Sequence, residues 1–231
     1  MENKKRTADF YDAYAGHQES VAFNERHRHL YECTKKLGLR ASSAVLDLGC
    51  GVGVMSALLL RTVTQGNYTA VDLSPKSIEA AKKRCAASPN AEFITADVCT
   101  FSRPGARYDF VTLFDVMEHI PGEEHDELIG NVAAFMHADS KLLINIPFAP
   151  YLRYAMQHFP ERMQELEVPI ASARLGALLD KHGLELLEMR TYGVWQENEY
   201  QLFIAEKKKD FMPRPLEQES FFRRLKRKFA G

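Results

Sequence analysis

The chain has 231 residues, of which 45% are hydrophobic and 26% are charged, with a formal net charge of −1. No stretch approaches the roughly 18 apolar residues of a membrane-spanning helix, and the N-terminus has no apolar core of a secretion signal. The four cysteines show no zinc-finger spacing. These features exclude membrane-spanning, secreted and zinc-finger proteins, and they predict one α/β domain in the cytoplasm with reduced thiols.

Charge is unevenly distributed along the chain. Residues 1–206 contain 21 Lys and Arg against 28 Asp and Glu, whereas residues 207–231 contain 9 against 3. An acidic body disfavours broad contact with nucleic-acid phosphates, so no nucleic-acid partner is expected.

The apolar pattern predicts an alternation of strands and helices. Residues 7–37 have helical spacing. Ser74 is predicted as the N-cap of a later helix, with Pro75 at its first position. Residues 148–170 interrupt the alternation with aromatic residues and prolines. The alternation predicts a doubly wound parallel sheet with helices on both faces. The expected strands are 44–48, 68–73, 92–97, 109–116, 141–147, 184–195 and 199–207, and the later helices are 53–64, 75–87, 123–137 and 172–182.

The stretch VLDLGCGVGVM, residues 45–55, turns from a strand through three glycines into a helix. Such a turn exposes backbone N–H groups to a polar or anionic ligand. Because Gly53 is followed by Val54 and Met55 rather than by Lys and Ser or Thr, a P-loop is excluded. The spacing G-x-G-x-G also differs from the dinucleotide fingerprint, which leaves a nucleoside cofactor as a candidate.

The following strands end in polar residues as well. Asp72 comes 23 residues after Gly49, where a carboxylate can accept hydrogen bonds from both ribose hydroxyls. The third strand ends in Asp97 and Val98, which could contact an adenine amino group and its ring. The fourth ends in FDVMEHI. Four successive strand ends therefore place polar groups at the edge where open α/β sheets bind ligands.

This combination resembles the class I S-adenosylmethionine-dependent methyltransferases over about residues 40–206, through D-x-G-x-G-x-G, VDLS and ADV. The segment YDFVTLFDVMEHIP is similar to ubiquinone-biosynthesis-type small-molecule O-methyltransferases. The resemblance implies a Rossmann-like, seven-stranded, mostly parallel sheet with one antiparallel strand. It also implies an N-terminal helical lid (1–40), a methyltransferase domain (41–206) and an insertion over the acceptor site (148–170).

The resemblance implies S-adenosylmethionine as the cofactor, with glycine backbone against its methionine part. Arg28 is expected to clamp the cofactor carboxylate, with an exposed helix arginine as the alternative, and Tyr14 in the lid is a candidate contact. Histidines 17, 27 and 29 have no supporting Cys or carboxylate cluster, so no metal is expected. The expected cofactor-binding residues are Arg28, Asp47, Gly49, Gly51, Asp72, Leu73, Asp97, Val98 and Phe114.

His119, in MEHIP, is the candidate catalytic base for a hydroxyl acceptor, because imidazole titrates near neutral pH. The alternative is that it fixes its loop by hydrogen bonds. The expected acceptor is a small molecule methylated on oxygen rather than nitrogen, in a pocket formed by Tyr151, Tyr154, Met156, His158 and Phe159. An N-methyltransferase, a nucleic-acid methyltransferase and a non-catalytic S-adenosylmethionine-binding module remain alternatives, although the N/D-P-P-Y/F motif is not present.

The C-terminal segment FFRRLKRKF, residues 221–229, places its apolar side chains on one side of a helix and five basic residues around the other. This pattern suits peripheral binding to an anionic membrane at its inner face, and hence a hydrophobic or lipid-linked acceptor. A disordered solubilising tail, or one docked on the domain, is the alternative.

Overall fold

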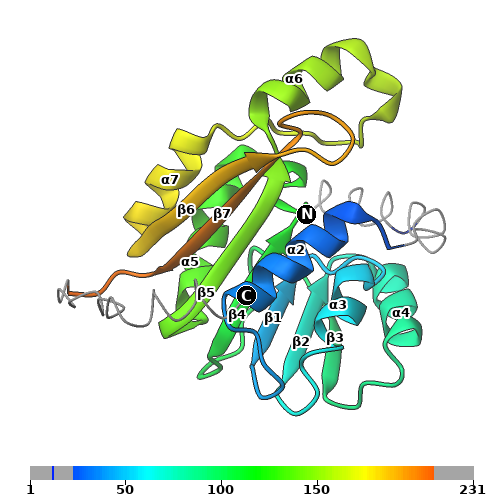
Figure 1. The fold of residues 1–231 in the computed structure, drawn as a ribbon, viewed down its shortest axis with the longest axis vertical. Helices are drawn as coiled ribbons and strands as arrows, with labels where there is room; N and C mark the ends of the chain where they lie inside the picture. The colour runs from blue at the N-terminus through cyan, green and yellow to red at the C-terminus, as the bar shows by residue number, and fades with distance from the viewer. Residues whose placement is uncertain (1–11, 13–22, 211–231) are drawn as a thin grey trace, which may run out of the picture.

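A computed structural model describes Asp12 and residues 23–210 of the protein. Its centre is a seven-stranded sheet in the order β3-β2-β1-β4-β5-β7-β6 (Figure 1). β7 runs antiparallel to both of its neighbours, and the other described pairs are parallel. The predicted sheet with one antiparallel strand is therefore confirmed. The strands are β1 (Val45–Leu48), β2 (Tyr68–Asp72), β3 (Ala91–Thr95), β4 (Tyr108–Phe114), β5 (Met136–Pro147), β6 (Leu184–Tyr192) and β7 (Tyr200–Lys207).

Helices cover both faces of the sheet, and alternate strand residues supply two cores. Leu46 and Leu48 of β1 face one core, which they share with α5 (His125–Ala134) and α7 (Ser172–Lys181). Val45 faces the opposite core, with α2 (Glu25–Lys36), α3 (Val54–Leu59) and α4 (Pro75–Arg84). Burial on both faces explains why the central strands are mostly apolar. Short 3-10 turns η1 (Met117–His119), η2 (Gly122–Glu124) and η3 (Pro160–Arg162) complete the described elements, together with α6 (Ala149–His158).

The helix expected over 7–37 is not continuous. Phe23 and Asn24 lie outside helical structure, and Asn24 begins α2 as its N-cap. Its side chain accepts from the His27 backbone N–H at 3.2 Å, while His27 Nδ1 accepts from the Asn24 N–H. This reciprocal capping box satisfies two N–H groups that have no partner within the helix. In contrast, the predicted cap at Ser74 is confirmed by its bond from the Ser77 N–H.

Strand β5 is longer than expected. The sequence pattern extends a helix to residue 137, but α5 ends at Ala134 and β5 begins at Met136. Tyr108 pairs with Met136, and the register then shifts before Phe110 pairs with Lys141. A bulged register of this kind breaks strict alternation, which explains why the first half of the strand has no clear period of two.

Several expectations concern residues outside the described part of the chain. These are Tyr14, His17 and the basic segment 221–229. Among the helices that are described, none has both the length and the apolar character needed to cross a bilayer.

Candidate active site

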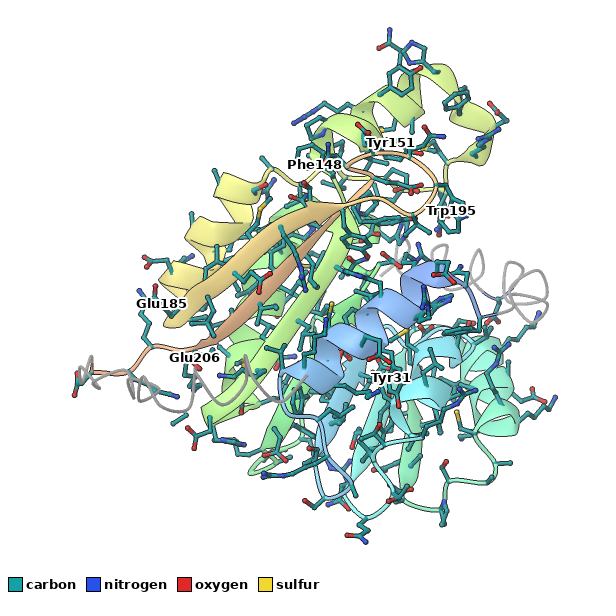
Figure 2. All side chains as sticks on the ribbon, in the orientation of Figure 1. Tyr31, Phe148, Tyr151, Glu185, Trp195 and Glu206 are labelled. Atoms are coloured by element: carbon teal, nitrogen blue, oxygen red, sulfur yellow. The ribbon has the colours of Figure 1, made fainter. Side chains whose placement is uncertain are left out.

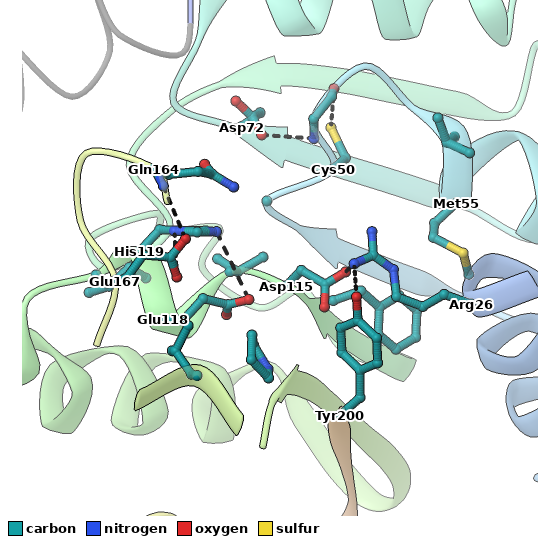
Figure 3. A pocket seen from close by; sticks show the side chains of 18 of the residues that line it. Arg26, Cys50, Met55, Asp72, Asp115, Glu118, His119, Gln164, Glu167 and Tyr200 are labelled. Carbon is teal, nitrogen blue, oxygen red and sulfur yellow. Dashed lines mark hydrogen bonds and ion pairs between the residues drawn. The ribbon is translucent and has the colours of Figure 1, made fainter. Parts of the chain in front are cut away.

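A cleft of about 620 Å³ lies at the carboxyl edge of the parallel strands. One half is lined by the glycine turn after β1 and by the ends of β2 and β3. The other half is lined by η1, α6 and the segment that follows α6. Figure 3 shows polar side chains from both halves facing the same space. The strand-end residues predicted from the sequence are therefore brought together.

The glycine turn has a backbone that other residues adopt with difficulty. Gly49, Gly51 and Gly53 have φ values of 75°, 51° and 78°. A Cβ added at Gly49 would lie 2.3 Å from a γ-carbon of Val116, and one at Gly53 would lie 2.9 Å from the Ala81 Cβ. Both the positive φ and the close packing therefore require glycine at position 49. The turn brings bare backbone to the wall of the cleft.

Asp72 supports this turn from the end of β2. Its Oδ2 accepts from the Gly51 N–H at 2.8 Å, and its Oδ1 accepts from the Ser74 N–H at 2.9 Å. Burial raises the pKa of Asp72, and these two hydrogen bonds oppose the shift. Carboxylate oxygens have further acceptor positions, so Asp72 can still bind ligand hydroxyls. Leu73 also lines the cleft.

One described residue from the N-terminal part of the chain, Asp12, contacts the start of α4. Asp12 accepts hydrogen bonds from the Ser74 hydroxyl and from the Lys76 N–H, the latter at 3.2 Å. A carboxylate is favoured at this position because it lies at the N-terminus of α4. Asp12 is thereby held close to Ser74, two residues after Asp72.

Asp97 and Val98 form the next part of the wall. Asp97 Oδ1 accepts from the Cys99 N–H at 2.9 Å, which holds the carboxylate at the start of the loop after β3. Val98 is buried and lines the cleft. Phe114, at the end of β4, also lines the cleft and is 8% exposed. These three residues lie where the sequence placed them.

Asp47 occupies the base of the glycine turn and is 2% exposed. Its Oδ2 accepts from the hydroxyls of Ser56 and Tyr68, both at 2.7 Å, and its Oδ1 accepts from Thr112 at 3.0 Å. Burial raises the pKa of this carboxyl, whereas the three hydroxyl donors lower it. Asp47 therefore contributes to the cleft mainly by holding the glycine turn in place. This role depends on three hydroxyl groups that lie outside the glycine motif in the sequence, so the motif alone does not reveal it.

The structure corrects the choice of arginine on α2. Arg28 does not line the cleft; its side chain is 62% exposed and pairs with Glu25 one turn away. Arg26 lines the cleft instead, with a side chain that is 22% exposed. Its Nη1 lies 3.1 Å from Asp115 Oδ2 and donates to the Tyr200 hydroxyl at 3.1 Å. Its buried Nε has no hydrogen-bond partner.

Asp115 connects Arg26 to the centre of the sheet. It has a φ of 58°, an uncommon conformation that aspartate tolerates better than most residues. Its Oδ1 accepts from Asn145 at 2.7 Å, and Asn145 in turn accepts from the Tyr192 hydroxyl at 2.8 Å. Arg26 is thus held by a network that begins on three different strands. The motif FDVMEHI contains Asp115, but nothing in its spacing identifies this partner.

His119 lies in η1 with a side chain that is 12% exposed. Its Nδ1 is 2.9 Å from the Leu166 carbonyl oxygen, so Nδ1 carries the proton and donates. Its Nε2 then accepts in the neutral ring and lies 3.9 Å from Glu118 Oε1. The bond from Nδ1 holds the ring against the segment after α6, and His119 lines the cleft.

The segment 148–170 forms part of the wall of the cleft. Tyr151 and Phe159 line it, but the other three residues expected to form this pocket do not. Tyr154 is 51% exposed and Met156 is 40% exposed, since they lie on the outer side of α6. The residues that sequence reasoning missed are Glu118, Leu152, Met163, Gln164, Glu167 and Glu199.

The two described histidines of the N-terminal trio have structural roles. His27 forms the capping box of α2, and its pKa is lowered to about 4, first by burial and then by Arg26. His29 stacks on Tyr192 with ring centroids 4.2 Å apart. Within the described residues, no three His, Cys, Asp or Glu side chains form a group that could hold a metal ion.

Residues 45–139 match the methyltransferase domain family. The chain is 27% identical to a malonyl-[acyl-carrier protein] O-methyltransferase of Halalkalibacterium halodurans, over 62% of this chain and 50% of that protein. It is 30% identical to a trans-aconitate 2-methyltransferase of Paracidovorax citrulli, over 54% and 46%. It is 28% identical to a ubiquinone biosynthesis O-methyltransferase of Coxiella burnetii, over 63% and 64%. The chain thus spans between about half and two thirds of these relatives' length.

Solved structures share the fold. Magnesium protoporphyrin IX methyltransferase from Synechocystis, solved with S-adenosylmethionine, superposes with a TM-score of 0.67 over 90% of this chain and 98% of that chain, at 18% identity. The sheet order, the glycine turn and the matched domain agree with one another. Residues 45–139 are therefore a methyltransferase domain, and the seven-stranded fold is that of the class I S-adenosylmethionine-dependent methyltransferases.

Proposed function

We propose that the protein transfers a methyl group from S-adenosylmethionine to an oxygen of a small-molecule acceptor. The observation that supports this is a single cleft in which the glycine turn, Asp72 and Asp97 face the η1 segment with His119. The names of two relatives state O-methylation. The names of all three relatives indicate different acceptors. The matched structure of a methyltransferase with bound cofactor supports the same cofactor here.

The residues of the first half of the cleft suit this cofactor. The backbone at Gly49 and Gly51 would approach its methionine part, because a side chain at position 49 has no room. Asp72, followed by Leu73, would accept from the ribose hydroxyls. Asp97 and Val98 would contact the adenine, with Phe114 beside the methionine chain. Arg26 takes the place expected for Arg28, since its guanidinium alone of the two lines the cleft.

Replacing Asp72 with alanine tests this assignment. Loss of buried hydrogen bonds is expected to weaken S-adenosylmethionine binding by about 1–3 kcal/mol. Isothermal titration calorimetry measures the affinity, with Asp139→Ala as the control because that side chain is 87% exposed. Wild-type affinity in the Asp72 variant would remove the assignment. Tight binding without transfer to any acceptor would favour the non-catalytic alternative.

The chemistry is an in-line displacement. S-adenosylmethionine, when bound, would supply an electrophilic methyl group, and the acceptor oxygen would bond to the methyl carbon while displacing a neutral thioether. The protein's main contribution is to align the acceptor in the second half of the cleft. His119 Nε2 would take the hydroxyl proton, while the Nδ1 bond to Leu166 holds the ring.

His119→Ala tests the base role. The turnover rate is expected to fall by roughly 10²–10⁴-fold, the usual contribution of a positioned base. The dependence of the rate on pH should also change, because the group proposed to take the hydroxyl proton is removed. The measurement is initial rate against pH with unchanged cofactor affinity as the control. A variant with the parent's rate and profile would show that His119 only fixes the loop.

The tail supports a second proposal, peripheral binding to an anionic membrane through residues 221–229. Each of its five basic side chains can contribute about 1 kcal/mol near an anionic surface. The full chain should co-sediment with phosphatidylserine vesicles at low salt and remain in the supernatant at high salt. A truncation after residue 210, which leaves β7 whole, should stay in the supernatant. Equal partitioning of both proteins would exclude the tail as the anchor.

A further inference from the structure

Two buried polar atoms at the η1 end of the cleft have no hydrogen-bond partner. They are Glu118 Oε2 and Gln164 Oε1. Glu118 is 2% exposed, and both residues line the cleft (Figure 3). A buried polar atom without a partner costs about 1–3 kcal/mol. A ligand that supplies the missing hydrogen bonds is therefore favoured at this point.

The segment that carries Gln164 is fixed against η1. The Val168 N–H donates to the Glu118 backbone oxygen at 2.8 Å, and the Leu166 carbonyl accepts from His119 at 2.9 Å. Glu167 accepts from the Gln164 N–H at 3.3 Å and has an oxygen 3.9 Å from His119 Nδ1. The two unpartnered atoms thus belong to one assembled wall and not to independent loops.

The charges of this end disfavour an anion. The carboxyl groups of Glu167 and Glu199 line it. Of the arginines described at the cleft, Arg26 is paired with Asp115, and Arg162 has a side chain that is 71% exposed. A carboxylate acceptor would approach like charges without a dedicated cation, which is unfavourable in a partly desolvated site.

A neutral hydroxyl meets the requirements of both atoms. Burial, with a smaller effect of Asp115, raises the pKa of Glu118 well above its usual value and favours the protonated acid. A protonated Glu118 can donate to the acceptor oxygen, and Gln164 Oε1 can accept a hydrogen bond from the acceptor hydroxyl before its proton passes to His119. The apolar side chains of Tyr151, Leu152 and Phe159 line the same end and suit an apolar body.

We propose that the acceptor is an apolar alcohol or phenol whose hydroxyl binds Glu118 and Gln164, and that the site rejects carboxylate acceptors. This inference rests on the proposed methyl transfer. It separates the chain from two of its relatives, whose named substrates, a malonyl group and trans-aconitate, are acids. In the reaction the O–CH3 bond would form as the S–CH3 bond breaks, and the hydroxyl proton would pass to the proposed base, His119.

Matched acceptors test the selectivity on the full chain. Labelled S-adenosylmethionine is offered with 4-butylphenol or 4-butylbenzoate, and with decanol or decanoate, at pH 7.5. We expect at least one hydroxyl member to react, and at least tenfold faster than its carboxylate partner. Equal or faster transfer to the carboxylate, or no transfer to either hydroxyl, overturns the inference.

Two variants test the named residues. Glu118→Leu and Gln164→Leu should each raise KM for the reactive hydroxyl acceptor at least tenfold, with a smaller change in kcat. Gln157→Leu is the control, because Gln157 is exposed on α6. If Glu118→Leu does not fold, Gln164→Leu still decides, and an unchanged KM there rejects the site.

Cofactor binding separates this inference from the proposed function. Calorimetry with S-adenosylmethionine alone involves neither Glu118 nor Gln164. A wild-type protein that fails to bind the cofactor contradicts the proposed function itself. Normal cofactor binding with the wrong acceptor preference contradicts only the inference about the acceptor.

Discussion

Gly49→Ala is expected to abolish cofactor binding and to lower the free energy of unfolding by about 2–5 kcal/mol. Two causes act together at this position. Alanine is strained at the φ of 75°, and its Cβ would lie 2.3 Å and 2.9 Å from the two γ-carbons of Val116. Relief requires movement of the turn or of η1, which follows Val116 directly. Either movement changes the wall of the cleft.

A matched glycine isolates the packing contribution. Gly105 has a φ of 81° but no atom within 4 Å of an added Cβ, so Gly105→Ala should cost about 1 kcal/mol from backbone strain alone. Adding Val116→Ala to Gly49→Ala removes both clashing γ-carbons and should recover part of the lost stability. Chemical denaturation and calorimetry measure the two effects. Equal losses at positions 49 and 105 would contradict the close approach.

The fold could be predicted because it depends on local patterns. Glycine turns, strand-end acids and the cap at Ser74 are set by residues close in sequence, and the carboxyl ends of parallel strands meet at one edge. That rule is sufficient to bring Gly51, Asp72 and Asp97 to one cleft without any knowledge of long-range packing.

Which of Arg26 and Arg28 faces the cleft depends on the direction in which each side chain leaves α2. Two residues along an α-helix differ by about 200° in direction, so only one of the pair can face the sheet. Arg26, Leu30 and Cys33 share the spacing of one face, and Leu30 and Cys33 are buried. That periodicity was available in the sequence and would have identified Arg26.

The acceptor end could not be predicted in the same way. Gln164 and Glu167 lie in an irregular segment after α6, and hydrogen bonds to η1 bring them to Glu118. Tyr151 and Trp195 lie at the same end of the molecule (Figure 2), where Glu199 accepts from the Trp195 N–H at 3.1 Å. No periodicity relates these segments, so only the folded chain reveals their proximity.

Arg26→Ala is expected to raise the dissociation constant for S-adenosylmethionine at least tenfold. Hydrogen bonds to charged groups contribute about 1.5–3 kcal/mol, and 1.4 kcal/mol corresponds to a factor of ten. The guanidinium lines the cleft and its buried Nε has no partner, which suits the carboxylate of the cofactor. The variant also removes the Arg26–Asp115 ion pair, so its stability should fall as well.

Two further variants separate binding from stability. Arg26→Lys keeps a positive charge beside Asp115 but loses the planar pair of donors, so it should recover stability more fully than affinity. Arg28→Ala is the matched control on the same helix, because its exposed side chain pairs only with Glu25 among the contacts described. Calorimetry should find its dissociation constant within twofold of the parent protein. A larger loss of affinity in Arg28→Ala than in Arg26→Ala would restore the original assignment, since the exposed arginine would then be the one that reaches the cofactor.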